Sequence, residues 1–150
     1  MGMISEAGCP AIADPGSLLV AQAHRKGLRV VPLVGPSSLL LALMASGFNG
    51  QNFAFHGYLP IDPAARTAKI KKMESTAYAE KQTQLFIETP YRNARMMQEL
   101  LHTCRPKTRI CVAAGLTCPN EFIRTLTVQE WRSTSLPDLQ KIPAIFLIYV

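Results

Sequence analysis

The chain has 150 residues, which is enough to bury one substantial hydrophobic core or two small ones. Apolar residues make up 48% and charged residues 17%, and this balance excludes a disordered polyelectrolyte. The net charge of +6 favours polyanionic partners without identifying one, because a merely soluble basic surface has the same composition.

The cysteines and histidines form no recognisable metal-binding pattern. The four cysteines contain no C-x-x-C pair, and the three histidines do not fall at zinc-site spacings. No apolar run reaches membrane-spanning length, and no basic-then-apolar leader is present. The sequence therefore predicts a cytoplasmic protein with reduced thiols, no metal and no membrane contact.

The chain is predicted to begin with a short strand, Met1–Ile4, that runs into a rigid loop over residues 5–16. The loop holds two glycines, two prolines and two carboxylates, which excludes a regular helix or the middle of a strand. In α/β proteins, ligands bind at the loops that follow strands. An ordinary surface turn is the alternative interpretation.

The next thirty residues read as helix, strand and helix. We expect a helix over Ser17–Lys26 and a strand over Leu28–Leu33, which together form a unit of a parallel sheet. The turn at residues 34–38 then opens an apolar helix, Leu39–Ser46. Its first hydroxyl groups either cap the helix or bind a ligand at its positive end.

A polar stretch around residues 47–52 indicates a domain boundary, which divides the chain into residues 1–50 and 51–150. A long helix is expected from Asp62 and Pro63. Its apolar residues share one face, and its basic residues are predicted to be solvated or, alternatively, to contact RNA phosphates. The apolar face has Ile70, Met73 and Ala77, and the basic side has Arg66, Lys69, Lys71 and Lys72.

The remaining elements alternate between strands and helices. The predicted elements are a strand Thr83–Ile87, a helix Asn93–Thr103, a strand Arg109–Ala114, a strand-and-turn excursion over 121–131 and a buried final strand Ile142–Val150. Glu88 and Arg92 follow the first of these strands. A structural ion pair between Glu88 and Arg92 is slightly favoured, and an active-site carboxylate at Glu88 is the alternative.

Five segments, in this order, resemble the tetrapyrrole (corrin/porphyrin) methylase superfamily, and they are closest to its branch that methylates ribosomal RNA of the small subunit. The segments are Ser5–Gly16, Gly35–Ser38, Phe53–Pro60, Glu88–Arg92 and Leu116–Glu121. The sequence departs from the family pattern at Glu6 and Cys9. It also has Ala114, Gly115 and Cys118 where the family has three charged residues.

The resemblance implies a two-lobed α/β fold whose first lobe is incomplete here, since the family's glycine-rich first strand and loop are missing. It further implies methyl transfer from S-adenosylmethionine, with ribosomal RNA as substrate and its ribose 2′-hydroxyl as acceptor. A tetrapyrrole or other small-molecule methyltransferase and a non-catalytic binding module are the alternatives. A chain without its first strand is also expected to cover its exposed edge by forming a homodimer.

The resemblance and the residue chemistry together nominate two sets of site residues. A hydroxyl acceptor must lose its proton, and the candidate carboxylates for that role are Glu6, Asp14 and Glu88. The candidate cofactor-binding residues are Gly8, Cys9, Pro10, Gly35, Pro36, Ser37, Ser38, Glu88, Leu116, Thr117, Pro143 and Ala144.

Overall fold

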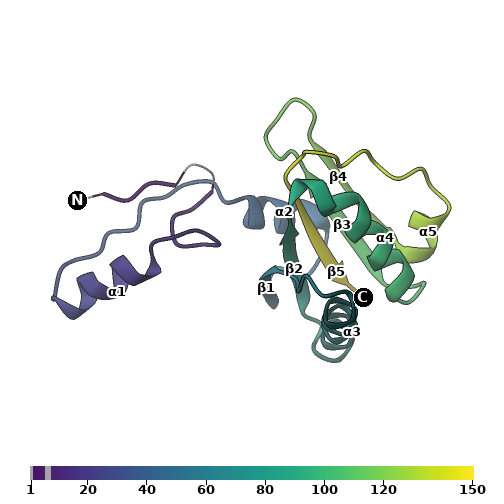
Figure 1. The fold of residues 1–150 in the computed structure, drawn as a ribbon, viewed down its shortest axis with the longest axis horizontal. Helices are drawn as coiled ribbons and strands as arrows, with labels where there is room; N and C mark the ends of the chain where they lie inside the picture. Colours follow the sequence, from purple (N-terminus) through teal and green to yellow (C-terminus); the bar gives the residue numbers. More distant parts are fainter. Residues whose placement is uncertain (1, 6–7) are drawn as a thin grey trace.

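The computed structural model describes residues 2–5 and 8–150, and its elements follow the order drawn in Figure 1. These elements are α1 (Ser17–Arg25), α2 (Ser38–Ser46), β1 (Phe53–Tyr58), α3 (Pro63–Glu80), β2 (Thr83–Glu88), the 3-10 helix η1 (Pro90–Arg92), α4 (Asn93–Thr103), β3 (Arg109–Ala114), β4 (Phe122–Thr127), α5 (Val128–Arg132) and β5 (Ala144–Tyr149).

Five strands form one mixed sheet in the order β1-β2-β5-β3-β4. β1 pairs parallel with β2, whereas β2–β5, β5–β3 and β3–β4 are antiparallel. β1, β2 and β3 therefore run in one direction, and β4 and β5 run in the other. The carboxyl ends of β1–β3 and the amino ends of β4 and β5 meet at one edge of the sheet, which we call the site edge.

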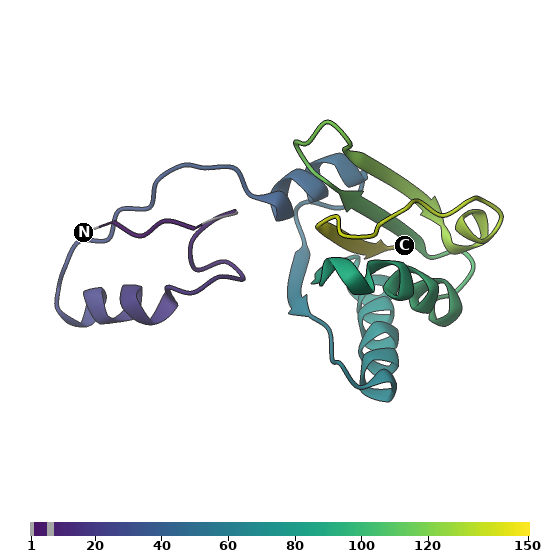
Figure 2. The same cartoon turned by 45° about the horizontal axis from the view of Figure 1, so that its top comes forward.

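Helices cover both faces of this sheet (Figures 1 and 2). Three helices, α3, α4 and α5, pack on one face and enclose the larger core, in which Phe86 and Phe146 stack between the helices and the sheet. On the other face, α2 contributes Ala42 and Leu43 to a smaller core. These three layers confirm the α/β fold class, although the sheet is mostly antiparallel rather than parallel.

The long helix α3 begins where the sequence predicts. Asp62 caps it by accepting a hydrogen bond from the backbone N–H of Ala65 (2.8 Å), and Pro63 occupies the first turn. The predicted apolar face is confirmed, because Ile70, Met73 and Ala77 are all buried. The prediction for Arg66 is wrong: its side chain is buried in a salt bridge rather than solvated with the lysines.

The predicted strands in the first fifty residues are absent from the described part of the chain. Residues 28–33 are extended but unpaired, and residues 2–4 have no strand either. An isolated extended segment has no ladder to complete its backbone hydrogen bonds, and its apolar side chains stay exposed, as Leu33 does at 90%. Figures 1 and 2 show residues 8–36, which we call the leading segment, projecting away from the sheet.

Two predicted helices of this region are present. α1 lies within the leading segment and buries no residue, whereas α2 packs against β3, β4 and β5. The hydroxyl of Thr125 on β4 donates to the carbonyl oxygen of Ser46 at the end of α2 (2.8 Å). α2 precedes residue 50 in sequence, yet it packs on the sheet that is formed by later residues. The division of the chain into two domains at residue 50 therefore stays a prediction.

None of the helices in the described ranges has the length and apolar character that crossing a membrane requires. Among residues 2–5 and 8–150, no three histidine, cysteine or acidic side chains are grouped to hold a metal ion.

Candidate functional site

The site edge brings together the candidates from the second half of the chain. Ala144, the first residue of β5, is in register with Glu88 on one side and with Ala114 on the other. The backbone N–H of Gly115 donates to the carbonyl oxygen of Pro143 (3.0 Å), so the loop after β3 lies against the start of β5. Pro143 and Ala144 thus lie beside the loop that carries Leu116 and Thr117, and Glu88 lies on the other side of β5.

Glu88 is held by its own loop and by one arginine. Its side chain is 2% exposed, and its Oε1 accepts hydrogen bonds from the backbone N–H of Thr89 (2.6 Å) and from Nη2 (2.7 Å) and Nε (3.0 Å) of Arg92. The predicted structural ion pair is therefore present. The register and this pair fix the carboxylate at the site edge.

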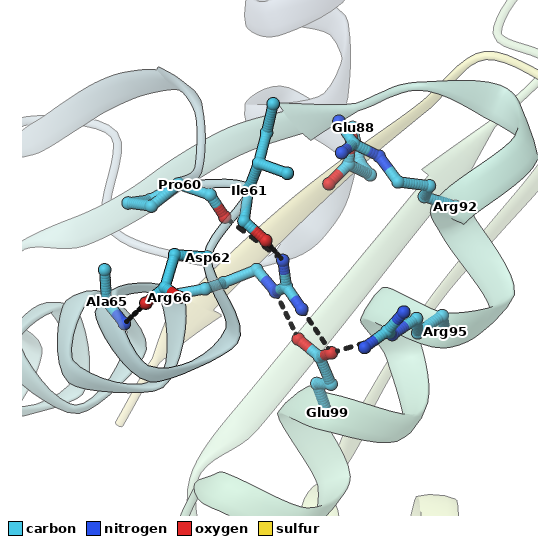
Figure 3. A network of polar contacts seen from close by, with 9 residues as sticks. All are labelled: Pro60, Ile61, Asp62, Ala65, Arg66, Glu88, Arg92, Arg95 and Glu99. Carbon is cyan, nitrogen blue, oxygen red and sulfur yellow. Dashed lines mark hydrogen bonds and ion pairs between the residues drawn. The ribbon is translucent and has the colours of Figure 1, made fainter.

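A cavity of about 210 Å³ lies beside Glu88, between the start of α3 and the first turns of α4 (Figure 3). We call it the arginine cavity. It is lined by Ile61, Arg66, Glu88, Arg92, Arg95, Met96 and Glu99. The sequence missed Arg95 and Glu99 because nothing in the motif pattern distinguishes them from other charged residues of an amphipathic helix.

The floor of this cavity is a salt-bridge network between α3 and α4. Arg66 binds Glu99 through Nε and Nη2, with Nη2 at 2.6 Å from Oε1, and its Nη1 donates to the carbonyl oxygen of Ile61 (2.7 Å). Arg95 reaches the same carboxylate through Nε (3.1 Å). Hydrogen bonding from Arg66 holds the pKa of Glu99 below its ordinary value, with Arg95 adding to the effect.

The loop after β3 is tight and conformationally strained. Gly115 has φ +58°, and Thr117 has φ +66°, which is unusual for a β-branched residue. The backbone N–H of Thr117 donates to a carboxylate oxygen of Glu121 (2.7 Å), and this bond closes the loop. Leu116 is half-buried against the smaller core, so Thr117 and not Leu116 is the exposed member of the pair.

Asn93 is a buried polar residue that the sequence prediction missed. It begins α4, is 0% exposed, and donates from Nδ2 to the carbonyl oxygen of Ile142 (2.7 Å), just before β5. Its Oδ1 is buried and has no hydrogen-bond partner within the described residues. The available signal was an asparagine at a helix start, which is ordinarily interpreted as a cap.

The candidates from the first half of the chain lie on the leading segment and at the start of α2. The thiol of Cys9 donates to the carbonyl oxygen of Pro36 (3.4 Å), which brings the two predicted loops together. Gly8 has φ +80°, a backbone conformation that favours glycine. Ser37 is the N-cap residue of α2 but makes no side-chain capping bond, and Ser38 begins the helix.

The remaining first-half candidates are placed as follows. Gly35 is exposed, Pro10 is half-buried next to Cys9, and Asp14 is half-buried without an interaction that fixes its role. Glu6 lies outside the described residues. The structure has no hydrogen bond or ion pair between residues 8–36 and residues 53–150. The candidate residues therefore form two separate groups rather than one joined site.

Sequence comparison supports the resemblance. The family model for Tetrapyrrole (Corrin/Porphyrin) Methylases matches residues 3–131. The chain is 34% identical over 130 residues to ribosomal RNA small subunit methyltransferase I of Vibrio cholerae, covering 87% of this chain and 44% of the relative. The protein of the same name from Xylella fastidiosa is 39% identical over 114 residues, with 76% and 40% covered. The chain thus spans less than half the length of these relatives.

Solved structures agree on the fold. The methyltransferase CobJ superposes with a TM-score of 0.59 at 20% identity, over 95% of this chain and 61% of that one. Uroporphyrin-III C-methyl transferase from Thermus thermophilus, complexed with S-adenyl homocysteine, gives 0.51 at 18% identity, with 95% and 62% covered. With the family match extending over most of its residues, the chain belongs to the tetrapyrrole (corrin/porphyrin) methylase family.

Proposed function

We propose that the chain is part of an S-adenosylmethionine-dependent methyltransferase that acts on ribosomal RNA, at a ribose 2′-hydroxyl. The carrying observation is the identity of 34% over 87% of the chain with a protein named for methylation of small-subunit ribosomal RNA. The net charge of +6 supports a polyanionic substrate.

The residues at the site edge fit a nucleoside cofactor. Ala114, Gly115 and Ala144 keep side-chain bulk away from this edge, and the unpartnered Oδ1 of Asn93 is a buried acceptor in the neighbouring first turn of α4. S-adenosylmethionine supplies a methyl carbon activated by a sulfonium, so the protein mainly has to align donor and acceptor. We assign the role of holding the cofactor to four candidates of the second half of the chain, Leu116, Thr117, Pro143 and Ala144. The leading segment and the start of α2 add the candidates Gly8–Pro10 and Gly35–Ser38.

The acceptor hydroxyl needs a group that takes its proton. Glu88 is the candidate that the geometry favours, because its Oε1 is engaged by Thr89 and Arg92 while no described residue donates to Oε2. Glu88 lies at the site edge and also lines the arginine cavity, and this position supports its assignment as the proton acceptor. Asp14 remains the second candidate on the leading segment.

The test uses the full-length protein that contains this chain. We expect calorimetric titration to detect S-adenosylhomocysteine binding, and we expect radiolabelled methyl groups to pass from S-adenosylmethionine to small-subunit ribosomal RNA. Methylation of a tetrapyrrole instead would favour the small-molecule alternative. A folded protein that binds no cofactor would favour the non-catalytic binding module.

The Gly8→Val variant tests whether the leading loop contributes to this site. A Cβ at Gly8 meets open space within the chain, so the expected loss of cofactor affinity comes from the φ of +80°, which valine resists, rather than from crowding. Gly50→Val is the matched control, because Gly50 has equal space and no positive φ. Unchanged affinity in Gly8→Val would show that the loop does not contribute to the pocket.

We further propose that the protein works in the cytoplasm as a homodimer. Its four cysteines are all free, which suits a reducing compartment. Several apolar side chains of the leading segment are exposed, including Leu18 at 82% and Leu33 at 90%. A second copy that covers them would remove this unfavourable surface from water.

A further inference from the structure

The arginine cavity carries one more positive charge than negative charge. Its charged lining residues are Arg66, Arg92, Arg95, Glu88 and Glu99. The three guanidinium groups come from α3, η1 and α4, and Figure 3 shows them near the two carboxylates. An excess of guanidinium around a small cavity is the electrostatic pattern that binds an anion.

Arg66 is the scaffold of this cavity and not a free donor. Its Nε and Nη2 bind Glu99, and its Nη1 donates to the carbonyl oxygens of Pro60 (3.1 Å) and Ile61 (2.7 Å). The side chain is 6% exposed, and both of its binding edges are used. Arg66 therefore orients Glu99, and Glu99 in turn holds Arg95.

Arg92 and Arg95 are only partly used. Arg92 gives Nε and Nη2 to Glu88, and Arg95 gives Nε to Glu99. Within residues 2–5 and 8–150, no acceptor is bonded to Nη1 of Arg92 or to either terminal nitrogen of Arg95. Their side chains are 35% and 66% exposed, so these remaining donors are accessible to a ligand.

The two carboxylates do not oppose an anion at this place. Glu88 faces Arg92 and the backbone N–H of Thr89, and Glu99 faces Arg66 and Arg95, so each negative charge is already matched. The cavity volume of about 210 Å³ exceeds that of several water molecules, at about 30 Å³ each. A phosphate group with bridging water fits this space.

We propose that Arg92 and Arg95 bind a phosphodiester group of the RNA substrate in the arginine cavity. This inference rests on the proposed function and adds the contact that positions the RNA. Because Arg92 also binds Glu88, a phosphate held by the two arginines lies directly beside the carboxylate at the site edge. The neighbouring ribose is thereby brought toward that edge by a contact that is independent of base sequence.

The test compares Arg95→Ala with Lys107→Ala in the full-length protein. Lys107 is an exposed cation of the turn between α4 and β3 and lies outside the cavity lining, so both variants lose one positive charge. We expect Arg95→Ala to weaken binding of a small-subunit ribosomal RNA fragment about tenfold, since charge-assisted bonds are the strong ones. The slope of log affinity against log salt should fall by about 0.7, the value for one single-strand phosphate. Lys107→Ala should change affinity less than twofold, and S-adenosylhomocysteine binding should be unchanged in both variants.

Each contrary outcome has its own meaning. If Arg95→Ala binds RNA as tightly as Lys107→Ala does, the phosphate site is wrong and the RNA function stands. If Arg95→Ala loses S-adenosylhomocysteine affinity instead, the anion is the cofactor's carboxylate and the proposal is overturned. If the wild-type protein binds inorganic phosphate through Arg95 but binds no RNA, the RNA function is wrong while the anion site remains.

Discussion

Glu88 combines a structural and a candidate chemical role in one side chain. Its Oε1 receives three hydrogen bonds from Thr89 and Arg92, which fix the turn between β2 and α4. The other oxygen, Oε2, receives no hydrogen bond from the described residues. The ion pair and the active-site carboxylate, which the sequence presents as alternatives, are therefore compatible in the folded chain.

The cysteines should differ widely in reactivity. Burial, with a contribution from the Glu74 carboxylate, raises the pKa of Cys104 to about 12, and burial also raises the pKa of Cys111. A thiol reacts as its thiolate, so these two stay protonated and unreactive at pH 8. We expect iodoacetamide at pH 8 to label the exposed Cys118 in the native protein, and to label Cys104 and Cys111 only after denaturation, as measured by peptide mass spectrometry. Labelling of native Cys104 at the rate of Cys118 would contradict the structure.

At this scale, the sequence predicts side chains that follow a local pattern and misses those that depend on distant partners. The Glu88–Arg92 pair is four residues apart and was predicted. The local pattern groups Arg66 with the lysines, because its partner Glu99 is 33 residues away on another helix. Asn93 was missed for the same reason, since it binds Ile142 from the far end of the chain.

The helices α3 and α4 are joined by the Arg66–Glu99 pair at the rim of the larger core. Arg66 is 5% exposed, so its charge depends on Glu99 and on the backbone carbonyls of the preceding loop. This pair fixes the spacing of the two helices and thereby the width of the arginine cavity. Loss of this pair should therefore lower the stability of the whole sheet domain, residues 38–150, and not only change its surface.

We expect Glu99→Gln to lower the free energy of unfolding by about 3 kcal/mol, because it leaves the buried Arg66 charge without its carboxylate. Urea denaturation at pH 7 measures the loss. The pKa of Glu99 is below its ordinary 4.5 in the folded protein, so its stabilising contribution is present above that pH and is lost on acidification. The wild type should therefore lose part of its advantage over Glu99→Gln as the pH falls below about 4.5. A constant difference at all pH values would show that the pair is not the cause.

Elements were predictable where local pattern and tertiary packing agree. α4 and β3 have the predicted bounds, Asn93–Thr103 and Arg109–Ala114, because their apolar spacing coincides with the larger core. The strand predicted over residues 28–33 has the right composition but no neighbouring strand in the described chain. A strand's propensity alone does not supply the ladder that stabilises it.

The whole molecule is divided between a packed sheet domain and an uncovered leading segment. The sheet order could not be predicted from sequence, because β5 begins 30 residues after β3 ends and 56 residues after β2 ends, yet it pairs with both. Helices on both faces of the sheet could be expected, because strands and helices alternate along the sequence. The site edge follows from that order, since it is β5 that joins Glu88 to the loop after β3.

The exposed leading segment predicts self-association. We expect light scattering at micromolar concentration to give the mass of a dimer, and we expect Leu33→Lys to weaken association about tenfold or more, since burial of one leucine contributes roughly 1.5–3 kcal/mol. Leu136→Lys is the matched control, because Leu136 is also exposed but lies in the sheet domain. A monomeric mass for the wild type, or an equal effect of both variants, would contradict the homodimer.

The central position of β5 has a consequence for synthesis on the ribosome. β5 is made after the other four strands of this sheet, yet it lies between β2 and β3 and hydrogen-bonds to both. Until residues 144–149 emerge from the exit tunnel, the parallel pair β1–β2 and the antiparallel pair β3–β4 each keep an open inner edge. The sheet therefore folds cooperatively only after these residues are translated, and a chain terminated before residue 144 would be prone to proteolysis.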